Sequence, residues 1–446
     1  MAGELTRRAR CSNFSSRATS RILLTVVSAL FIALLSKSAA ADTPEANHVW
    51  SLDELVDELT RSNSQLEQAK QVYLAAQLQV PQANAFPAAQ ISLLEQASTG
   101  GPFNFNVNDG FYEYPTLTQP FLWWGKRRLA GELANAQAEV LGRQYDGLVI
   151  QLVSQLKLAF YGLAALKHQL AFMNEDLQRL DQIKQVTQVR YANNAAAYVD
   201  FLNAQVSQSS LENDRFALEK QIQQQLEQLN SLLGRPSQTP LQVRDTQTSP
   251  RLPAKSLGEL IEVAQKTNPL IAGGESQIEA ADKSVALAEK GFYPDFAVNV
   301  GAYEQPGLTH LGSTRLYQVG VTLNLPTWGF RKEKATLDQA RVQLKSTKAG
   351  QSSNLQQVDL NVANAYHGLE TSLQQIKFTR ERLLPQAQMA YRLALTGYSS
   401  NGGTAFSDLL TAQSSLRSTE LALIRAENAA VQAYISLAAA IGRDPD

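Results

Sequence analysis

Long stretches of the chain carry apolar residues at helical spacing, whereas two shorter regions alternate between apolar and polar residues. Apolar residues three or four positions apart predict helices. In this way the pattern predicts helices at 52–80, 126–190, 198–233, 257–290, 331–397 and 405–441. Each of the long helices, 126–190 and 331–397, would extend for about 100 Å at a rise of about 1.5 Å per residue.

Strict alternation marks the predicted strands. Residues 296–301 (FAVNVG) and 317–325 (YQVGVTLNL) put apolar side chains on one face and polar or small ones on the other, as in the wall of a membrane β-barrel. The pattern is weaker at 91–93 and at 112–121, where Pro115 interrupts it. Aromatic residues concentrate around these strands. They indicate girdles at the bilayer interfaces, although strand propensity alone would explain part of the excess.

The order helix, two strands, long helix, turn and helix occurs twice, and short motifs repeat with it. The paired motifs are SLDEL at 51–55 and SLGEL at 256–260, WGKR at 124–127 and WGFR at 328–331, DFLNAQ at 200–205 and DLLTAQ at 408–413, and LGR at 233–235 and IGR at 441–443. A spacing of about 205 residues is far longer than a solenoid unit. It predicts a doubled fold.

The first forty residues fit a secretory signal peptide. A basic start precedes an apolar run at 22–35, and the alanines before Asp42 offer a cleavage site. A transmembrane anchor is the alternative, but the run is shorter than the roughly 20 residues that a spanning helix needs. No later stretch is expected to be apolar enough for a membrane helix, so any later insertion would use β-strands. We therefore predict a signal peptide at 1–41, a first structural repeat at 42–255 and a second at 256–446.

The helix lengths predict how the helices are arranged. In each copy the two shorter helices together match the long one in length, so we expect them to lie end to end beside it. A mid-level loop at 237–255 would join the copies. One chain would supply four strands, whereas the smallest membrane barrels have about eight. A dimer would close eight strands around side chains, and a trimer would close twelve around a pore.

Composition excludes several classes of protein. A net charge of −1 argues against nucleic acid as a partner. The single cysteine, Cys11, precedes the apolar run, so the mature chain would have neither disulfides nor thiolate metal sites. His48, His168, His310 and His367 share no metal-ligand spacing, and we expect structural or solvated roles for them; a lumenal cation site at His168 and His367 is the alternative. Without a catalytic motif or a cofactor loop, the chain is not expected to be an enzyme or to bind a cofactor.

The duplicated unit, the DLLTAQ motif and the Gly-Arg after each returning helix resemble the TolC family of outer-membrane efflux proteins along the whole mature length. Within that family, QPFLWWGKRR at 119–128 resembles the CzcC-like cation-efflux branch. The resemblance implies a mainly α protein with a membrane β-barrel. Duplicated long-helix hairpins would form an α-barrel in the periplasm, and four strands per chain would contribute to a twelve-stranded barrel of a homotrimer in the outer membrane.

The resemblance also implies a function and partners. It predicts the exit duct of a tripartite efflux pump that exports divalent metal cations and confers heavy metal resistance. Its partners would be outer-membrane lipid, a periplasmic adaptor (membrane fusion) protein and an inner-membrane pump of the resistance-nodulation-division type. The alternatives are a TolC-type duct for drug efflux or type I protein secretion, a periplasmic adaptor, and a structural coiled coil. An adaptor would show one hairpin between β-rich halves, and a coiled coil would lack strands.

The sequence departs from the family in two places. Many relatives carry a lipidated N-terminal cysteine, which the mature chain lacks. Relatives with an acidic ring at the closed aperture place carboxylates before the second tip, whereas no acidic residue lies between Gln386 and Tyr398 here. The sequence pattern therefore does not identify which residues gate the aperture.

The candidate functional residues lie in the two turns between a long helix and its returning helix. These turns would lie farthest from the strands, and we expect them to dock the adaptor; turn chemistry alone is the alternative. The candidates are Tyr191, Asn193, Asn194, Tyr198, Asp200, Tyr398, Asn401, Gly402, Gly403, Thr404 and Asp408. The two aspartates follow the turns, where a carboxylate near a helix start is favoured.

Two further features have a predicted structural role. Residues 125–128 (GKRR) are expected to join the barrel to the helices at the level of the lipid headgroups, with an anion site at a helix start as the alternative. Pro385 is expected to bend the second long helix.

Overall fold

The computed structural model describes residues 48–93, 95–97, 110–113, 115–244, 250–305, 314–325, 329–400 and 403–445. The predicted signal peptide lies outside these residues. The described chain divides into two compact units. One holds residues 48–50 and 240–242, with β1 (Val49–Trp50) and the first residue of β6 (Gln242–Val243). The other holds the remaining elements, including both turns and the strands beside the long helices.

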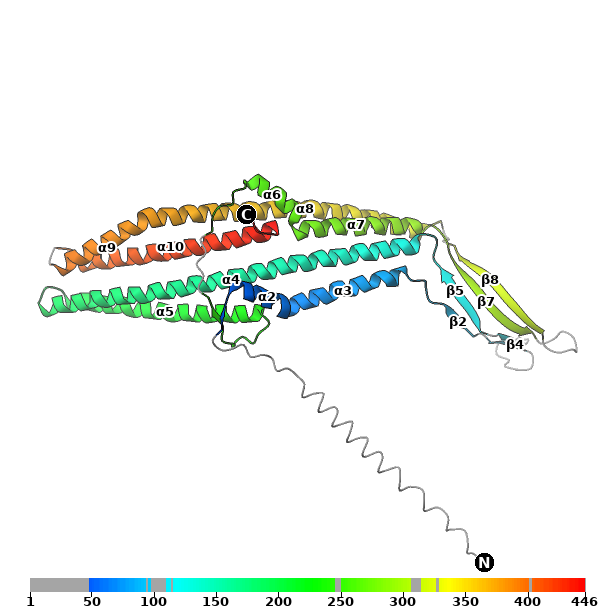
Figure 1. The fold of residues 1–446 in the computed structure, drawn as a ribbon, viewed down its shortest axis with the longest axis horizontal. Coiled ribbons are helices and arrows are strands. Elements are labelled where there is room, and N and C mark those ends of the chain that lie inside the picture. The colour runs from blue at the N-terminus through cyan, green and yellow to red at the C-terminus, as the bar shows by residue number, and fades with distance from the viewer. Residues whose placement is uncertain are drawn as a thin grey trace, which may run out of the picture. The chain divides into compact units, whose positions relative to one another are not determined.

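Helices make up most of this second unit (Figure 1). In chain order they are α2 (Leu52–Ser62), α3 (Ser64–Asn84), α4 (Lys126–Ala192), α5 (Tyr198–Leu232), α6 (Leu257–Thr267), α7 (Pro269–Lys290), α8 (Arg331–Phe378), the π-helix η2 (Thr379–Leu383), α9 (Leu384–Ser399) and α10 (Phe406–Ile441). The long helix α4 packs against α3, α5, α7 and α10, and α10 also packs against α8 and α9. The structure is therefore mostly helical, as predicted.

The predicted continuous helices at 52–80 and 257–290 are wrong, because each is two helices broken at an asparagine. Asn63 ends α2 and caps α3, where its side chain accepts hydrogen bonds from two N–H groups of the first turn at 2.9 and 3.1 Å. Asn268 does the same between α6 and α7, with one such bond at 2.8 Å. An asparagine side chain competes for backbone N–H groups, so it favours a cap over a helix interior.

The returning helices end at these two breaks. The amide of Asn63 donates to the backbone oxygen of Leu232 at 2.8 Å, and that of Asn268 donates to Ala440 at 2.7 Å. The glycine that follows α5 allows the close approach: Gly234 has a φ of +68°, and a Cβ there would lie 2.8 Å from a backbone oxygen of α2. α5 therefore ends against the start of α3, and α10 against the start of α7, which is the end-to-end arrangement that the helix lengths predict.

The strands form one antiparallel sheet in the second unit. They are β2 (Gln90–Ser92), β3 (Glu95–Ala97), β4 (Gly110–Glu113), β5 (Thr116–Phe121), β7 (Asp295–Gln305) and β8 (Thr314–Asn324). β2 pairs with β5, β3 with β4, and β7 with β4, β5 and β8. The described chain thus has six strands here instead of the four predicted. One added break contains Pro115, which has no N–H to donate to the ladder.

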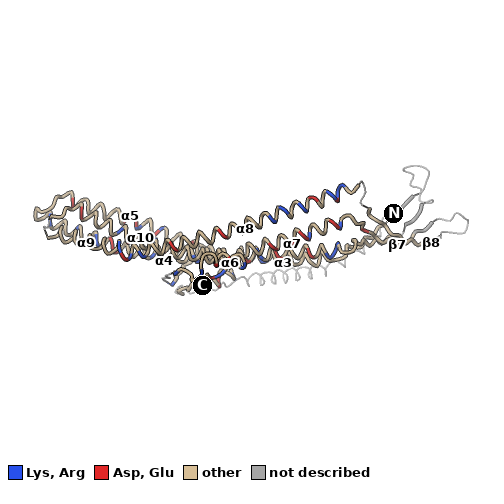
Figure 2. The backbone as a smooth tube through the Cα atoms, turned by 90° about the horizontal axis from the view of Figure 1, so that it is seen from above, with Lys and Arg blue, Asp and Glu red and all other residues tan. Residues whose placement is uncertain are grey.

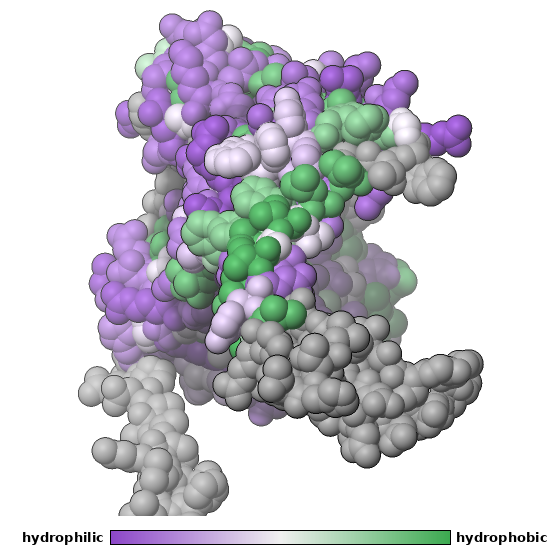
Figure 3. All heavy atoms as spheres, turned by 90° about the vertical axis from the view of Figure 1, so that its right-hand side faces the viewer, coloured by the Kyte–Doolittle hydropathy of each residue, from purple (hydrophilic) through white to green (hydrophobic). Residues whose placement is uncertain are grey.

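One face of this sheet is apolar and exposed. The register puts Leu117 opposite Val300 and Val300 opposite Val319, so these side chains share a face. Alternation along β8 adds Val321 and Leu323 to it. The five side chains are between 45% and 74% exposed. Figure 3 looks onto this end of the unit and shows a band of hydrophobic residues there.

α4 corrects another expectation. It contains an 18-residue window with a mean hydropathy of 1.5, which is apolar enough to cross a membrane by length and composition. The prediction that no such stretch follows the first forty residues is therefore wrong. Packing gives the physical reason, because α4 packs mainly against α3, α5, α7 and α10 and buries Leu152, Leu156, Phe160 and Leu163 at helical spacing.

The predicted bend at Pro385 takes the form of a π-helix. η2 directly precedes α9, and Pro385 occupies the first turn of α9. Proline has no N–H and its ring crowds the preceding turn, so the regular helical ladder cannot continue through it. The wider π turn accommodates the interruption while the helix axis continues into α9.

Candidate functional site

The α4–α5 and α9–α10 turns lie at the end of the second unit opposite the strands (Figure 1). In the first turn Asn194 has a left-handed φ of 59°, and the N–H of Ala195 donates to the oxygen of Arg190 at 2.8 Å. In the second turn Gly403 has a φ of 81°. Glycine and asparagine tolerate this conformation best. Asn194 and Gly403 therefore have a backbone role.

Arg190 connects the two turns. Its guanidinium donates to the backbone oxygen of Tyr398 in α9 and, at 3.0 Å, to that of Ala195. The same group lies 4.5 Å from the centre of the Tyr398 ring, a cation–π contact. Tyr398 is only 3% exposed and packs against Phe406 at a centroid distance of 5.7 Å. Arg190 was not among the predicted docking residues, because its position in the last turn of a long helix carries no distinctive signal in the sequence.

The structure brings the predicted docking residues to one end of the unit but does not expose all of them. The exposed ones are Tyr191, Asn193, Asn194, Tyr198, Gly403 and Asp408. Asp200 and Thr404 are half-buried, and Tyr398 is buried. Thr404 lies against Gly397, where an added Cβ would be 2.2 Å from the threonine hydroxyl. Asn401 and Gly402 lie outside the described residues.

Asp200 and Asp408 lie in the first turns of α5 and α10. The N-cap residues of these helices are Ala197 and Ala405, so neither aspartate holds the N-cap position itself. A negative charge in the first turn still interacts favourably with the helix dipole. Helix stabilisation through charge accounts for both residues, and the exposed Asp408 is also available to a partner.

A buried polar cluster joins the two hairpins about a quarter of the way along α4 from the turns. Asp176 is completely buried, and its two carboxylate oxygens accept hydrogen bonds from the side-chain amide of Gln413 in α10 at 2.9 and 2.8 Å. Arg179 lies 3.5 Å from Asp176 and pairs with Glu420 of α10 at 2.9 Å. The hydroxyl of Tyr391 in α9 is also buried nearby and has no hydrogen-bond partner in the described chain.

Burial raises the pKa of the Asp176 carboxyl, because a charged carboxylate loses its hydration in this cluster. The hydrogen bonds from Gln413 and the positive charges of Arg179 and Arg417 oppose that shift. Burial also raises the pKa of the Tyr391 hydroxyl. The cluster therefore holds the hairpins together through a carboxylate whose charge is costly to keep.

None of the predicted site residues belongs to this cluster, yet the sequence contains a signal for it. Asp176 falls on the same helical stripe as Leu180, Ile183 and Thr187, all of which are buried. An acidic residue in an otherwise apolar stripe indicates a buried, hydrogen-bonded carboxylate. Its partner, however, could not be identified from the stripe alone.

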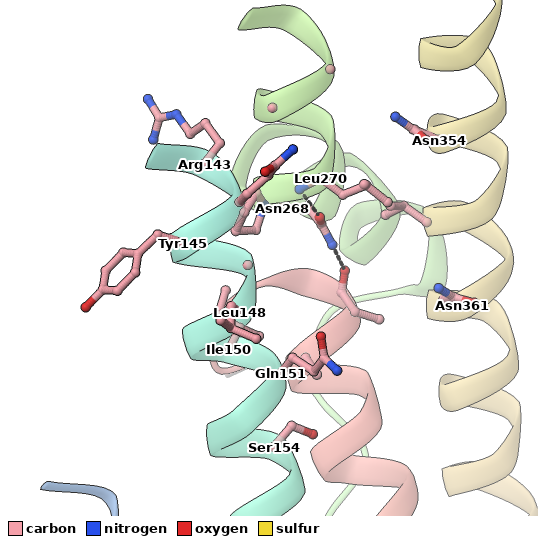
Figure 4. Close-up of a pocket in the computed structure, with 18 of the residues that line it drawn as sticks. Arg143, Tyr145, Leu148, Ile150, Gln151, Ser154, Asn268, Leu270, Asn354 and Asn361 are labelled. Carbon is pink, nitrogen blue, oxygen red and sulfur yellow. Dashed lines mark hydrogen bonds between the residues drawn. The ribbon is translucent and has the colours of Figure 1, made fainter. Parts of the chain in front are cut away.

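An open groove of about 1420 Å³ lies where α10 ends and α7 begins (Figure 4). Residues of α3, α4, α7, α8 and α10 line it, and asparagine and glutamine predominate among the polar ones. Asn268, which caps α7, lies in its wall beside Leu270. Among the described residues that line the groove, Arg143 is the one charged side chain. The groove thus offers a nearly neutral surface, largely apolar with amide side chains among it, and its described lining lacks carboxylate ligands for a cation.

The predicted junction at 125–128 has a defined geometry. The Lys126 amine donates to Asp295 and to the backbone oxygen of Tyr293, both at 2.9 Å, so it ties the start of α4 to the start of β7. The Arg127 guanidinium lies 3.8 Å from the centre of the Phe86 ring. These contacts support the interpretation of this segment as a connection between strands and helices.

The described residues contain no group of three or more His, Cys, Asp or Glu side chains that could hold a metal ion. His367 lies 3.4 Å from Glu370, one turn along α8. His310 lies outside the described residues. A lumenal cation site at His168 and His367 therefore has no structural support in the part of the chain described.

Comparison with known proteins agrees with this architecture. The chain superimposes on the outer-membrane channel OprN with a TM-score of 0.76 and 18% identity, covering 91% of this chain and 95% of that one. CusC gives a TM-score of 0.76 and 19% identity, with 88% and 92% covered. The outer membrane protein VceC from Vibrio cholerae gives 0.73 and 21%, with 89% and 97% covered. No curated protein sequence matches the chain significantly.

The sequence itself carries the stronger match. The profile described as "Outer membrane efflux protein" matches residues 55–235 and again residues 260–443, which together are most of the chain. Its two matches coincide with the two occurrences of the same element order. Proteins of this family are channels and not enzymes. The chain belongs to the outer membrane efflux protein family.

Proposed function

We propose that the chain is the outer-membrane exit duct of a tripartite efflux pump, in which three copies close one channel. The sheet carries this proposal. Its outer strands, β2, β3 and β8, each pair with one other strand within the described chain, and one sheet face is apolar and exposed. Unpaired backbone groups are not tolerated in a bilayer, so such a sheet must close with other copies.

A trimer fits the strand count best. Each repeat crosses the sheet twice. In the first repeat β2 and β3 form one crossing and β4 and β5 the other, and in the second repeat β7 and β8 form one crossing each. Three chains would therefore supply twelve crossings, or arms. Eight arms from a dimer would enclose a lumen filled by side chains. In this proposal residues 1–41 are a signal peptide, 42–255 and 256–446 are the two structural repeats, and the helices form a tube in the periplasm.

The groove beside α7 supports a passive lumen. None of its described lining residues comes from the short helices α2 and α6. We assign the groove to the lumen. A nearly neutral lining without carboxylates offers no strong charge to hold an ion, which suits a duct whose selectivity lies in its pump.

The proposal predicts a trimer in detergent and a clear difference between the two sheet faces. Val319 and Gln318 are neighbours on β8 that point to opposite faces. Val319→Arg is expected to reduce insertion, because arginine on the lipid face costs about 2–4 kcal/mol near the bilayer centre. Gln318→Arg, the matched control, should insert normally. Light scattering measures the mass in detergent, and planar-bilayer conductance measures insertion. The mass of a monomer, or equal insertion of the two variants, would contradict the proposal.

The two turns are proposed to meet a periplasmic adaptor, which connects the duct to an inner-membrane pump of the resistance-nodulation-division type. They lie at the end of the helices away from the sheet, so a membrane-embedded sheet puts them deepest in the periplasm. Their exposed side chains, Tyr191, Tyr198 and Asp408 among them, are available for contact.

Divalent metal cations are the proposed substrates. The resemblance of residues 119–128 to the CzcC-like branch supports this assignment, and within those residues Lys126 and Gln119 both make structural hydrogen bonds. A TolC-type duct for drugs or for type I protein secretion is the alternative. The carboxylate-free groove is compatible with both, because it does not select for cations.

Deletion of the gene tests the substrate class. We expect the deletion strain to lose tolerance to zinc, cobalt, cadmium or copper, measured as growth inhibition, and to recover it with the wild-type gene. Dyes and antibiotics serve as the control solutes. Unchanged metal tolerance with lost tolerance to dyes would assign the duct to drug efflux instead.

A further inference from the structure

The apolar face of the sheet continues into an aromatic and then a basic region at the start of α4. Phe121 lies opposite Phe296, which lies opposite Leu323, so this row shares the apolar face and is its row nearest the helices. Trp124 packs on Phe296 at 5.7 Å and is 70% exposed. Phe86 contacts Phe121 at 6.0 Å. Aliphatic side chains thus give way to aromatic ones on the same face.

Basic side chains follow directly. The Arg127 guanidinium covers the Phe86 ring at 3.8 Å, and Arg128 is exposed beside it. Arg128 pairs with Glu132 at 2.7 Å on the helix surface. Such an exposed pair is weak and exchanges readily for another anion. The start of α4 has Gly125 as its N-cap residue, without a side-chain cap, and helix starts favour negative charge.

The start of α8 adds to this charge. Arg331, Lys332 and Lys334 are exposed, and none has an ion-pair partner in the part of the chain described. Figure 2 shows blue Lys and Arg positions recurring along the strand-side half of α8. Phe330, directly before Arg331, contacts Phe292 at 5.8 Å, which places this cluster beside the end of α7.

We propose that Arg127 and Arg128, with Trp124, bind the phosphate groups of anionic phospholipids in the bilayer leaflet on the helix side, and that the start of α8 adds to the attraction. The order aliphatic, aromatic, basic on one continuous face matches the order acyl chain, interface, phosphate in a bilayer. The inference rests on the proposed function, because it requires the sheet to be embedded. The proposed ligand is a phospholipid, so a free phosphate ion should not compete with it for this site.

Lipid binding to the purified trimer tests this. Native mass spectrometry or lipid exchange in nanodiscs would compare phosphatidylglycerol with phosphatidylcholine, with inorganic phosphate as competitor. The wild type should prefer phosphatidylglycerol, and inorganic phosphate should not displace it. The double variant Arg127→Gln, Arg128→Gln should lose roughly fivefold in affinity for each charge removed. Arg127→Lys, Arg128→Lys should keep the preference, which separates charge from the packing on Phe86.

The matched control removes two exposed charges far from the sheet, by Lys220→Gln and Arg392→Gln. It should leave the preference unchanged. An undiminished preference in the Arg127 and Arg128 glutamine variant, equal loss in the control, or displacement by inorganic phosphate overturns the lipid site. Planar-bilayer conductance distinguishes failure of this inference from failure of the proposed function. A wild type that conducts without lipid preference refutes this inference alone, whereas a wild type that never inserts refutes the proposed function and the inference with it.

Discussion

Replacement of Gln413 by leucine is expected to loosen the contact between α4 and α10 strongly. The amide of Gln413 supplies two hydrogen bonds to the buried carboxylate of Asp176. Without it, that carboxylate would stay buried with no hydrogen bond from Gln413, and only the charges of Arg179, at 3.5 Å, and Arg417 would offset its burial. A buried charge that loses its partner costs about 3 kcal/mol.

Hydrogen exchange of the α4 and α10 amides measures this local stability. A loss of about 3 kcal/mol corresponds to exchange that is roughly 100-fold faster around the cluster. Gln205→Leu is the matched control, since Gln205 ends the same motif in the first copy but is exposed. It should change stability by less than about 0.5 kcal/mol. Equal effects of the two variants would show that the Asp176 contact does not hold the hairpins together.

The same contact is expected to depend on pH. Because burial raises the pKa of Asp176 above its ordinary value, the folded protein binds this proton more readily than the unfolded chain does. The contribution of Asp176 to stability therefore falls as the pH rises from the ordinary carboxyl pKa through the raised one, and is regained as the pH falls. The groups that face it are Gln413, Arg179, Arg417, Glu420 and Tyr391.

Asp176→Asn isolates this effect, because asparagine can still bond to Gln413 but cannot titrate. Exchange in the wild type should slow on mild acidification, while exchange in the variant should follow only the intrinsic pH dependence of amide exchange. A wild type and a variant with the same corrected pH profile would mean that Asp176 does not titrate in this range.

Efflux is expected to fall to the level of the deletion strain when a negative charge is placed on either turn. Ala195→Glu and Ser400→Glu change exposed side chains of the two turns. Arg190 binds the backbone oxygen of Ala195, which the substitution keeps, and the Ser400 hydroxyl donates to Thr396 within the same helix. Both variants should leave trimer yield and membrane insertion intact, since both side chains are exposed. Thr404 is unsuitable for this test because it lies against Gly397. Gln238→Glu, in the mid-level loop, is the control and should transport normally.

Crosslinking gives an independent measurement. The mature chain is predicted to lack cysteine, so single cysteines at 195, 400 or 238 would be unique. Those at 195 and 400 should crosslink to the adaptor in cells, and the one at 238 should not. If turn variants that assemble also transport at the wild-type rate, the turns have no docking role and their composition reflects turn geometry alone.

Tertiary contacts give some of the candidate turn residues a structural role instead of the predicted docking role. Tyr398 was predicted to meet a partner, yet it is buried under Arg190 and against Phe406. Its counterpart Tyr191 is 46% exposed although it occupies the equivalent place in the first copy. The duplication gives both turns the same local sequence pattern. The two hairpins pack against each other, however, so equivalent residues of the two copies have different neighbours.

The sequence by itself determined the duplication, the helical and strand segments and the family, because these depend on periodicity and short motifs within each segment. It also placed the turns and the Gly-Arg endings. Only the tertiary structure decided that Asn63 and Asn268 break helices, that Gln413 is buried while Gln205 is exposed, and which sheet rows share a face. The asparagine breaks and the burial of Gln413 each involve a partner about 170 to 240 residues away in the chain, and the sheet face depends on pairing between strands of both repeats. Periodicity along one segment does not reveal which distant backbone oxygen or side chain will satisfy a buried polar group.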